Sequence, residues 1–188
     1  RDSENFAEAP APPIAAPPME EVKDQLSQQL QEQNLKKQFD ALKAKGIRVV
    51  AWYLPGFVKP SLDVRRTRAM LSFRTPNGAA FDGVALDIES LRLKSAGLRT
   101  TRLLALSRIL RAEAGETPIA AITYPSRGFE RHPTWWPNFP WQQLTGLVDA
   151  WIPMTYTGTS FPGYDATYGY VARSMRLLRT AVGPELPI

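Results

Sequence analysis

The sequence of 188 residues has no cysteine and only one histidine, His132. Without cysteine the chain can form neither disulfide bonds nor the thiolate nucleophile of a cysteine enzyme. A single histidine without a Gly-x-Ser-x-Gly elbow gives no support for a Ser-His-Asp triad, and metal sites built from several histidine or cysteine ligands are excluded. We therefore expect no metal site and no cofactor.

Long apolar runs are also lacking. No stretch reaches the roughly eighteen apolar residues that a transmembrane helix needs, so no membrane span is expected. Charges of both signs are present, with 23 Lys and Arg against 18 Asp and Glu and a net charge of +5. The arginines are spread over helix-like segments, which favours solvated helix faces over nucleic-acid binding. The positive net charge would also favour a mild attraction of the chain to anionic cell-wall polymers.

The N-terminal part is expected to hold a linker and a helix. Residues 1–18 carry five prolines among alanines, which predicts a disordered linker, either a spacer of an exported protein or a tail without a role. Acidic residues begin the segment 19–45, basic residues end it and Gly46 follows, which predicts a helix. Its apolar stripe is thin, so we expect it to pack on its own domain. Docking of a protein partner, with the domain as a scaffold, is the alternative.

From residue 46 to 188, strand-like and helix-like segments alternate. Strands are expected at 47–54, 81–89, 118–124 and 149–156, helices at 62–71, 100–114 and 171–182, and a further strand opens at 186–188. This alternation predicts an α/β domain with a parallel sheet.

One expected strand, 81–89, carries two carboxylates near its end. Because side chains alternate on a strand, Ala85, Asp87 and Glu89 share one face, opposite Val84, Leu86 and Ile88. Unpaired carboxylates are costly to bury, and at the carboxyl end of a barrel strand their usual role is chemical. Ion pairs with nearby arginines are the structural alternative.

Residues of the expected strand 81–89 resemble the signature of a known enzyme family. Asp82, Gly83, Asp87 and Glu89 resemble the fourth-strand signature Asp-Gly-x-Asp-x-Asp-x-Glu of glycoside hydrolase family 18, the chitinases and their relatives, with Ala85 in place of the middle Asp.

A second segment strengthens the resemblance. Met154 and Tyr156 are similar to the Met-x-Tyr on the sixth strand of that family, although Thr157 follows where Asp or Asn is usual. The resemblance covers about residues 47–188 and implies a (β/α)8 TIM barrel. A full barrel needs about 250 residues, so residues 46–188 would form a partial, incomplete barrel of about strands three to seven. A protein partner is one possible source of the missing strands.

The resemblance also implies an activity. It suggests a secreted or cell-surface hydrolase that binds a polysaccharide or oligosaccharide and cuts N-acetylhexosamine polymers such as chitin or cell-wall glycan. Glu89 would be the general acid, while Asp87 would orient the 2-acetamido group of the sugar and raise the pKa of Glu89. Tyr156 would donate a hydrogen bond to that group, and Met154 would line the floor. Because Ala85 removes a proton relay, a catalytically inactive carbohydrate-binding barrel is the alternative.

Aromatic residues add further candidates for substrate binding. The loop 128–141 is rich in tryptophan, and its aromatic faces could stack on sugars or pack the loop onto the domain. Trp135 and Trp136 are the expected sugar contacts, and Trp141 is the expected packing residue. The remaining candidates are Trp52 and Tyr53, of which only one can face inward, Tyr124, Asp82, and Asp165 as a replacement carboxylate.

Overall fold

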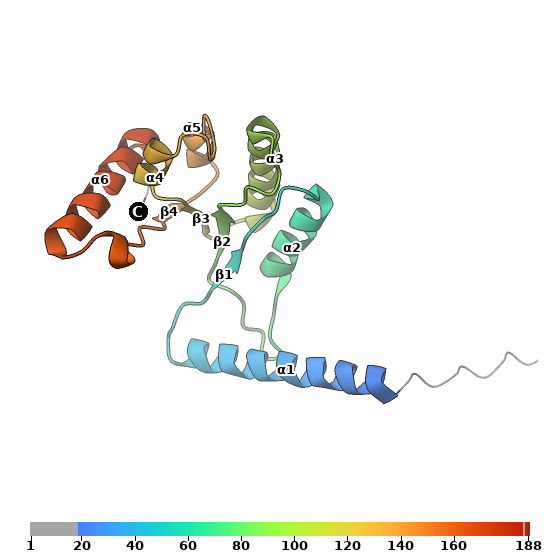
Figure 1. The fold of residues 1–188 in the computed structure, drawn as a ribbon. Helices are drawn as coiled ribbons and strands as arrows, with labels where there is room; N and C mark the ends of the chain where they lie inside the picture. Colours follow the sequence, from blue (N-terminus) through green and yellow to red (C-terminus); the bar gives the residue numbers. More distant parts are fainter. Residues whose placement is uncertain (1–18, 186) are drawn as a thin grey trace, which may run out of the picture. The chain divides into compact units, whose positions relative to one another are not determined.

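The computed structural model describes residues 19–185 and 187–188, so the expected linker at 1–18 lies outside the described part. The described chain has an α/β architecture (Figure 1). Its elements are α1 (Met19–Ala44), β1 (Val50–Tyr53), α2 (Pro60–Ser72), β2 (Gly83–Ile88), α3 (Ala96–Ala114), β3 (Ile119–Thr123), α4 (Ser126–Arg131), α5 (Trp141–Thr145), β4 (Ala150–Pro153), the 3-10 turn η1 (Gly158–Ser160) and α6 (Tyr164–Val182).

The chain divides into two units between Gln38 and Phe39. Most of α1 lies in the first unit, where an ion pair of 2.6 Å joins Lys36 to Glu32 one turn earlier, and its last residues, 39–44, belong to the second unit. The second unit, Phe39–Ile188, contains all four strands and the other helices. The packing of the 19–45 helix on this domain stays a prediction.

The strands of the second unit form one parallel sheet in the order β1-β2-β3-β4. The register places Trp52 beside Ala85, and Asp87 beside Ile122, which in turn lies beside Ile152. Each strand lies next to the one that follows it in sequence, as expected when helices connect parallel strands. The predicted α/β class with a parallel sheet is confirmed.

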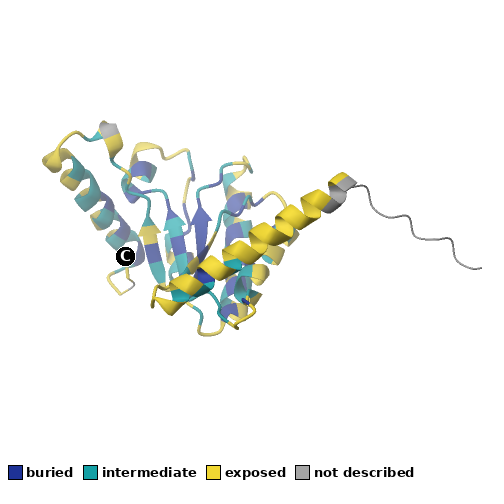
Figure 2. Cartoon of the chain, turned by 90° about the horizontal axis from the view of Figure 1, so that it is seen from below, coloured by how far each residue is buried: buried dark blue, intermediate teal, exposed yellow. Residues whose placement is uncertain are grey.

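One face of the sheet is covered by helices. Leu86, Ile88 and Trp151 point into a buried cluster with side chains of α3 such as Leu103 and Leu110. Figure 2 shows β2 buried along its whole length. Burying one such side chain stabilises the fold by about 1.5–3 kcal/mol. This face therefore holds the core.

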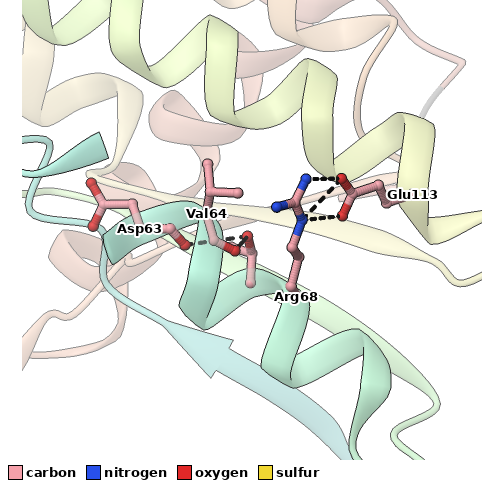
Figure 3. Close-up of polar contacts among 5 residues, drawn as sticks. Asp63, Val64, Arg68 and Glu113 are labelled. Atoms are coloured by element: carbon pink, nitrogen blue, oxygen red, sulfur yellow. Dashed lines mark hydrogen bonds and ion pairs between the residues drawn. The ribbon is translucent and has the colours of Figure 1, made fainter. Parts of the chain in front are cut away.

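Local signals fix the helices that surround this core. Pro60 starts α2, where its fixed φ and missing N–H cost little. The Ser95 hydroxyl accepts a hydrogen bond of 3.3 Å from the Leu98 N–H, so α3 begins at 96 rather than at the expected 100. Arg68 of α2 makes a bidentate ion pair with Glu113 of α3, with a closest distance of 2.6 Å (Figure 3).

The opposite face of the sheet is apolar and open. We call it the open face; a hollow of about 560 Å³ on it is lined by Val50, Trp52, Ala85, Ile122 and Ile152. Trp52 is 63% exposed and Ile152 is 47% exposed. Parallel sheets are normally covered on both faces, so this face is suited to packing against further structure.

Within residues 19–185, none of the helices combines the length and the apolar character that crossing a bilayer requires.

Candidate functional site

A pocket of about 470 Å³ lies at the carboxyl ends of β2, β3 and β4. We call it the main pocket; its wall includes Glu89, Tyr124 and Met154, each of which is the first residue after one of these strands. Carboxyl ends of neighbouring parallel strands meet at one edge of a sheet, where α/β proteins bind their ligands. Further lining residues are Pro125, Gly128, Arg131, His132, Trp135, Tyr156, Ser160, Phe161 and Tyr170.

Asp87 lies in an adjoining hollow of about 330 Å³ on the open face. Trp52 and Ile122 line this hollow with it, while Met154 and Tyr156 line both the hollow and the main pocket. Since residues two apart on a strand are about 6–7 Å apart, Asp87 and Glu89 stand side by side at the boundary. The structure therefore brings together Asp87, Glu89, Met154, Tyr156 and Trp52, but not Asp82 of the first motif.

The Asp87 side chain is buried, and its carboxylate is poorly compensated by neighbouring groups. Its residue is only 2% exposed, and its Oδ1 atom has no hydrogen-bond partner in the described part of the chain. Burial and the nearby negative charge of Glu89 raise the pKa of Asp87 to about 6, while a hydrogen bond from Trp52 opposes the shift. Burial at this position therefore favours the protonated form of Asp87.

No ion pair involves Asp87 or Glu89 among the described residues, although six other ion pairs are present there. The structural alternative, in which arginines neutralise this pair, therefore finds no support. An unpaired buried carboxylate costs folding free energy, and such costs are typical of groups that are kept for function.

Tyr124 connects the two carboxylates to the aromatic wall. Its hydroxyl donates a hydrogen bond of 3.0 Å to the backbone oxygen of Glu89. Burial, and then the charges of Glu89 and Asp87, raise the pKa of the Tyr124 hydroxyl. Its ring lies 4.7 Å from the ring of Trp135. The Tyr124 hydroxyl therefore stays protonated and holds the backbone at Glu89.

The two neighbouring tryptophans have different environments. Trp135 lines the main pocket, and His132 stacks on it at 4.3 Å with an interplanar angle of 15°. Trp136 is 2% exposed, and its Nε1 donates a hydrogen bond of 2.9 Å to Thr100. Trp135 can therefore contact a ligand, whereas Trp136, also expected to do so, belongs to the core. Trp141 packs against Trp151 at 5.3 Å, as expected of a packing residue.

On β1, Trp52 faces the open side of the sheet and Tyr53 the helix side. The Tyr53 hydroxyl donates a hydrogen bond of 2.5 Å to Asp63 of α2. Trp52 is therefore the residue of the pair that lies beside Asp87 on the open face, and Tyr53 lines a separate pocket.

Two expected carboxylates lie elsewhere. Asp82 precedes β2 at its amino end, where it accepts a hydrogen bond of 2.7 Å from the Val49 N–H and pairs with Lys43. Asp165 is an exposed residue in the first turn of α6 and is not among the residues that line the main pocket. The structure brings neither of them to Glu89.

Several lining residues of the main pocket were not predicted from the sequence, among them Arg131, Phe161 and Tyr170. Arg131 ends α4, Phe161 follows η1, and Tyr170 lies in α6. The rings of Phe161 and Tyr170 stack at 4.1 Å. They come from a long βα connection and a helix, and neither carries a periodic signal that would have identified it. Together with Trp135 they make the wall strongly aromatic, which suits the apolar faces of sugar rings.

No group of three or more His, Cys, Asp or Glu side chains in the described part could hold a metal ion. The carboxylates at and beside the main pocket are Glu89 and Asp87. Comparisons with protein-family models, with curated proteins and with solved structures give no match for this chain.

Proposed function

We propose that this chain forms part of a glycoside hydrolase-like (β/α)8 barrel that cleaves β-linked N-acetylhexosamine polymers, such as chitin or cell-wall glycan. The observation that carries the proposal is the unpaired Asp87 and Glu89 pair beside a pocket with an aromatic wall, at the carboxyl end of a parallel sheet. Such a substrate implies secretion or a position at the cell surface.

The barrel is supported by topology. Four consecutive parallel strands, with helices on one face and an apolar hollow on the other, match the outer and inner faces of a (β/α)8 barrel. The N–H of Trp151 in β4 also donates a hydrogen bond of 3.0 Å to the oxygen of Pro187, so the chain after α6 returns beside β4. The open face would be covered by further βα units, from this protein or from a partner.

The proposed chemistry assigns one task to each side chain. Glu89 protonates the glycosidic oxygen as the bond to the anomeric carbon breaks, and the 2-acetamido oxygen of the same sugar attacks that carbon. Asp87, in its ionised form, accepts the acetamido N–H and balances the positive charge that develops. Tyr156 donates to the acetamido oxygen, Met154 lines the floor, and Trp135 stacks on the sugar. Glu89, as a carboxylate, then activates the water that completes hydrolysis.

A sugar-binding barrel without activity is the second candidate, and one observation favours it. Below Asp87 the open face carries Ala85, Ala120 and Ile122, so no carboxylate lies next to Asp87 there to pass a proton; the charged residues of that hollow, Arg48 and Asp82, lie at the amino end of the sheet. Such a barrel would keep the aromatic pocket but would not cleave its ligand.

The deciding experiment measures reducing-end release from N-acetylglucosamine oligomers, with tryptophan fluorescence recorded on the same samples. The longest available form of the protein is compared with Glu89→Gln and with the control Glu116→Gln, a change at an exposed residue between α3 and β3. A hydrolase predicts turnover that falls at least about a hundredfold in Glu89→Gln and is unchanged in the control.

Quenching without turnover in the wild type would favour the inactive sugar-binding barrel. The absence of both would contradict the two proposals together. Cleavage of plain glucans, but not of acetamido sugars, would contradict the role given to the acetamido group.

A further inference from the structure

A second pocket, of about 220 Å³, is formed by the segments that follow β1 and β2 and by α2. We call it the basic pocket because Lys59, Arg66 and Arg92 line it, together with a single carboxylate, Asp63. Arg92 follows Glu89 by three residues in one connection, so the basic pocket opens at the same edge of the sheet as the main pocket.

Asp63 holds this loop together and has little capacity left for a ligand. Its Oδ1 accepts hydrogen bonds from the Tyr53 hydroxyl at 2.5 Å and from the Gly56 N–H at 3.3 Å. Its Oδ2 accepts from the Phe57 N–H at 3.1 Å. Phe57 is held at a φ of 58°, a strained value for a residue other than glycine. The carboxylate therefore fixes the loop after β1 in one conformation.

The three cations, in contrast, have no carboxylate partner among the described residues. Four arginines of this domain do have carboxylate partners: Arg68 is paired with Glu113 (Figure 3), Arg111 with Asp149, and both Arg127 and Arg173 with Glu130. Arg66 lies 5.6 Å above the centre of the Tyr53 ring, a cation–π contact that positions its guanidinium without neutralising it. The basic pocket thus concentrates positive charge in a concave site.

We propose that the basic pocket binds a carboxylate or phosphate group carried by the glycan whose cleaved bond lies at Glu89. The inference rests on the proposed function for its polymer and narrows the substrate to an anionic N-acetylhexosamine glycan. Guanidinium groups bind carboxylate and phosphate oxygens in a bidentate manner, and Arg66 and Arg92 supply two of them to one small site. The net charge of +5 would also attract such a polymer.

The position of Arg92 links this pocket to the catalytic pair. A Cβ atom added at Gly56 would lie 3.8 Å from the Arg92 Nη1 atom, so the connections after β1 and β2 touch here. Because Arg92 follows Glu89 by three residues, a glycan bound at Glu89 would extend toward the basic pocket under this proposal. Recognition of a charged neighbour at this subsite is the specificity that the geometry supports.

The test is a binding titration, so that it does not depend on turnover. We would titrate the full chain by calorimetry with a neutral N-acetylglucosamine oligomer, an oligomer of alternating N-acetylglucosamine and glucuronic acid, a phosphorylated N-acetylglucosamine oligomer, and inorganic phosphate. The variants are Arg66→Gln, Arg92→Gln and the control Arg65→Gln, which removes an exposed charge from the same helix outside the pocket. Circular dichroism checks that each variant is folded.

We expect an anionic oligomer to bind at least about tenfold more tightly than the neutral one at low salt, with the advantage lost in Arg66→Gln and Arg92→Gln but kept in Arg65→Gln. Comparison of the glucuronic acid oligomer with the phosphorylated oligomer shows which anionic group is preferred. Titration with inorganic phosphate shows whether an anion binds the basic pocket without an attached sugar. Equal binding of neutral and anionic oligomers, or equal losses in Arg65→Gln, would overturn the inference.

A single-stranded oligonucleotide that binds more tightly than either anionic oligomer, in a manner dependent on Arg66, would also overturn it. Failure of the proposed function gives a different pattern, in which no N-acetylglucosamine oligomer is cleaved by the wild type. If neutral oligomers are cleaved and the anionic ones have no advantage, the proposed function stands and only the anion subsite is lost.

Discussion

Asp82 and Asp87 lie at the two ends of β2, and their surroundings are opposite. At the amino end, the hydrogen bond and charge of Lys43 and the Val49 N–H lower the pKa of Asp82. At the carboxyl end, burial and Glu89 raise the pKa of Asp87 to about 6. Aspartate thus forms a stabilising ion pair at one end of the strand. At the other end it is a buried carboxyl group whose ionised form is disfavoured.

This contrast follows the division of labour in parallel α/β sheets. The amino ends of the strands contribute to stability, and the carboxyl ends with their loops carry the binding sites. In this chain the residues that follow β2, β3 and β4 line the main pocket, whereas Asp82 joins the last turn of α1 and the segment after it to the start of β2. Variants of the two aspartates can therefore test whether the contrast has functional meaning.

The largest difference is expected in turnover. Under the proposed function, Asp87→Asn removes the charge that balances the reacting acetamido group, so the turnover number should fall by about a hundredfold or more. Asp82→Asn, far from the reacting sugar, should change it by less than about twofold. Reducing-end release measured for both variants at pH 7 checks this, and equal losses would remove Asp87 from the mechanism.

The next difference concerns stability and its dependence on pH. The pKa of Asp87 is higher in the folded state, about 6, than in the unfolded chain, 3.8, so the folded state binds more protons between these values. Stability should therefore decrease as the pH rises through this window, by about 1–3 kcal/mol. Asp87→Asn cannot ionise and should be more stable than the wild type by that amount at pH 7.

Urea unfolding of the wild type and Asp87→Asn at pH 4 and pH 7 measures this difference. The advantage of the variant should disappear at pH 4, where the Asp87 carboxyl is protonated in the wild type as well. An advantage of the same size at both values of pH would mean that the ionisation of Asp87 is not the cause.

Much of the second unit could be predicted from its sequence because the signals were local. Alternation on 81–89 correctly placed Asp87 on the face opposite Leu86 and Ile88, and the order of apolar segments gave the four strands. The position of Asp82 could also have been derived. Five residues along a strand cover about 16 Å, so Asp82 and Asp87 cannot lie at the same end.

What the sequence could not reveal depends on tertiary packing. Trp135 and Trp136 are adjacent in a loop without regular periodicity, and only the contacts of Trp136 with Thr100 and with Arg99, 4.7 Å away, assign it to the core. Likewise, Trp52 and Tyr53 had to face opposite sides, but the choice between them is made by Asp63, ten residues away on α2. Local patterns contain no information about such partners.

The smallest expected effect is that of Asp82→Asn on stability, and its pH dependence has the opposite sign. A lowered pKa in the folded state means that the Asp82 carboxylate stabilises the fold above the pKa of the unfolded chain, and that this contribution is lost as the pH falls through the lowered value. Asp82→Asn should therefore be less stable than the wild type at pH 7, by less than Asp87→Asn gains, and the deficit should shrink in acid. The ion pair between Lys43 and Asp82 is partly exposed to solvent, so its attraction is screened by dissolved ions. Added salt should therefore reduce the stability deficit of Asp82→Asn as well. Unfolding curves at low and high salt test this, and a deficit that grows in acid would mean that the ion pair does not stabilise this end of β2.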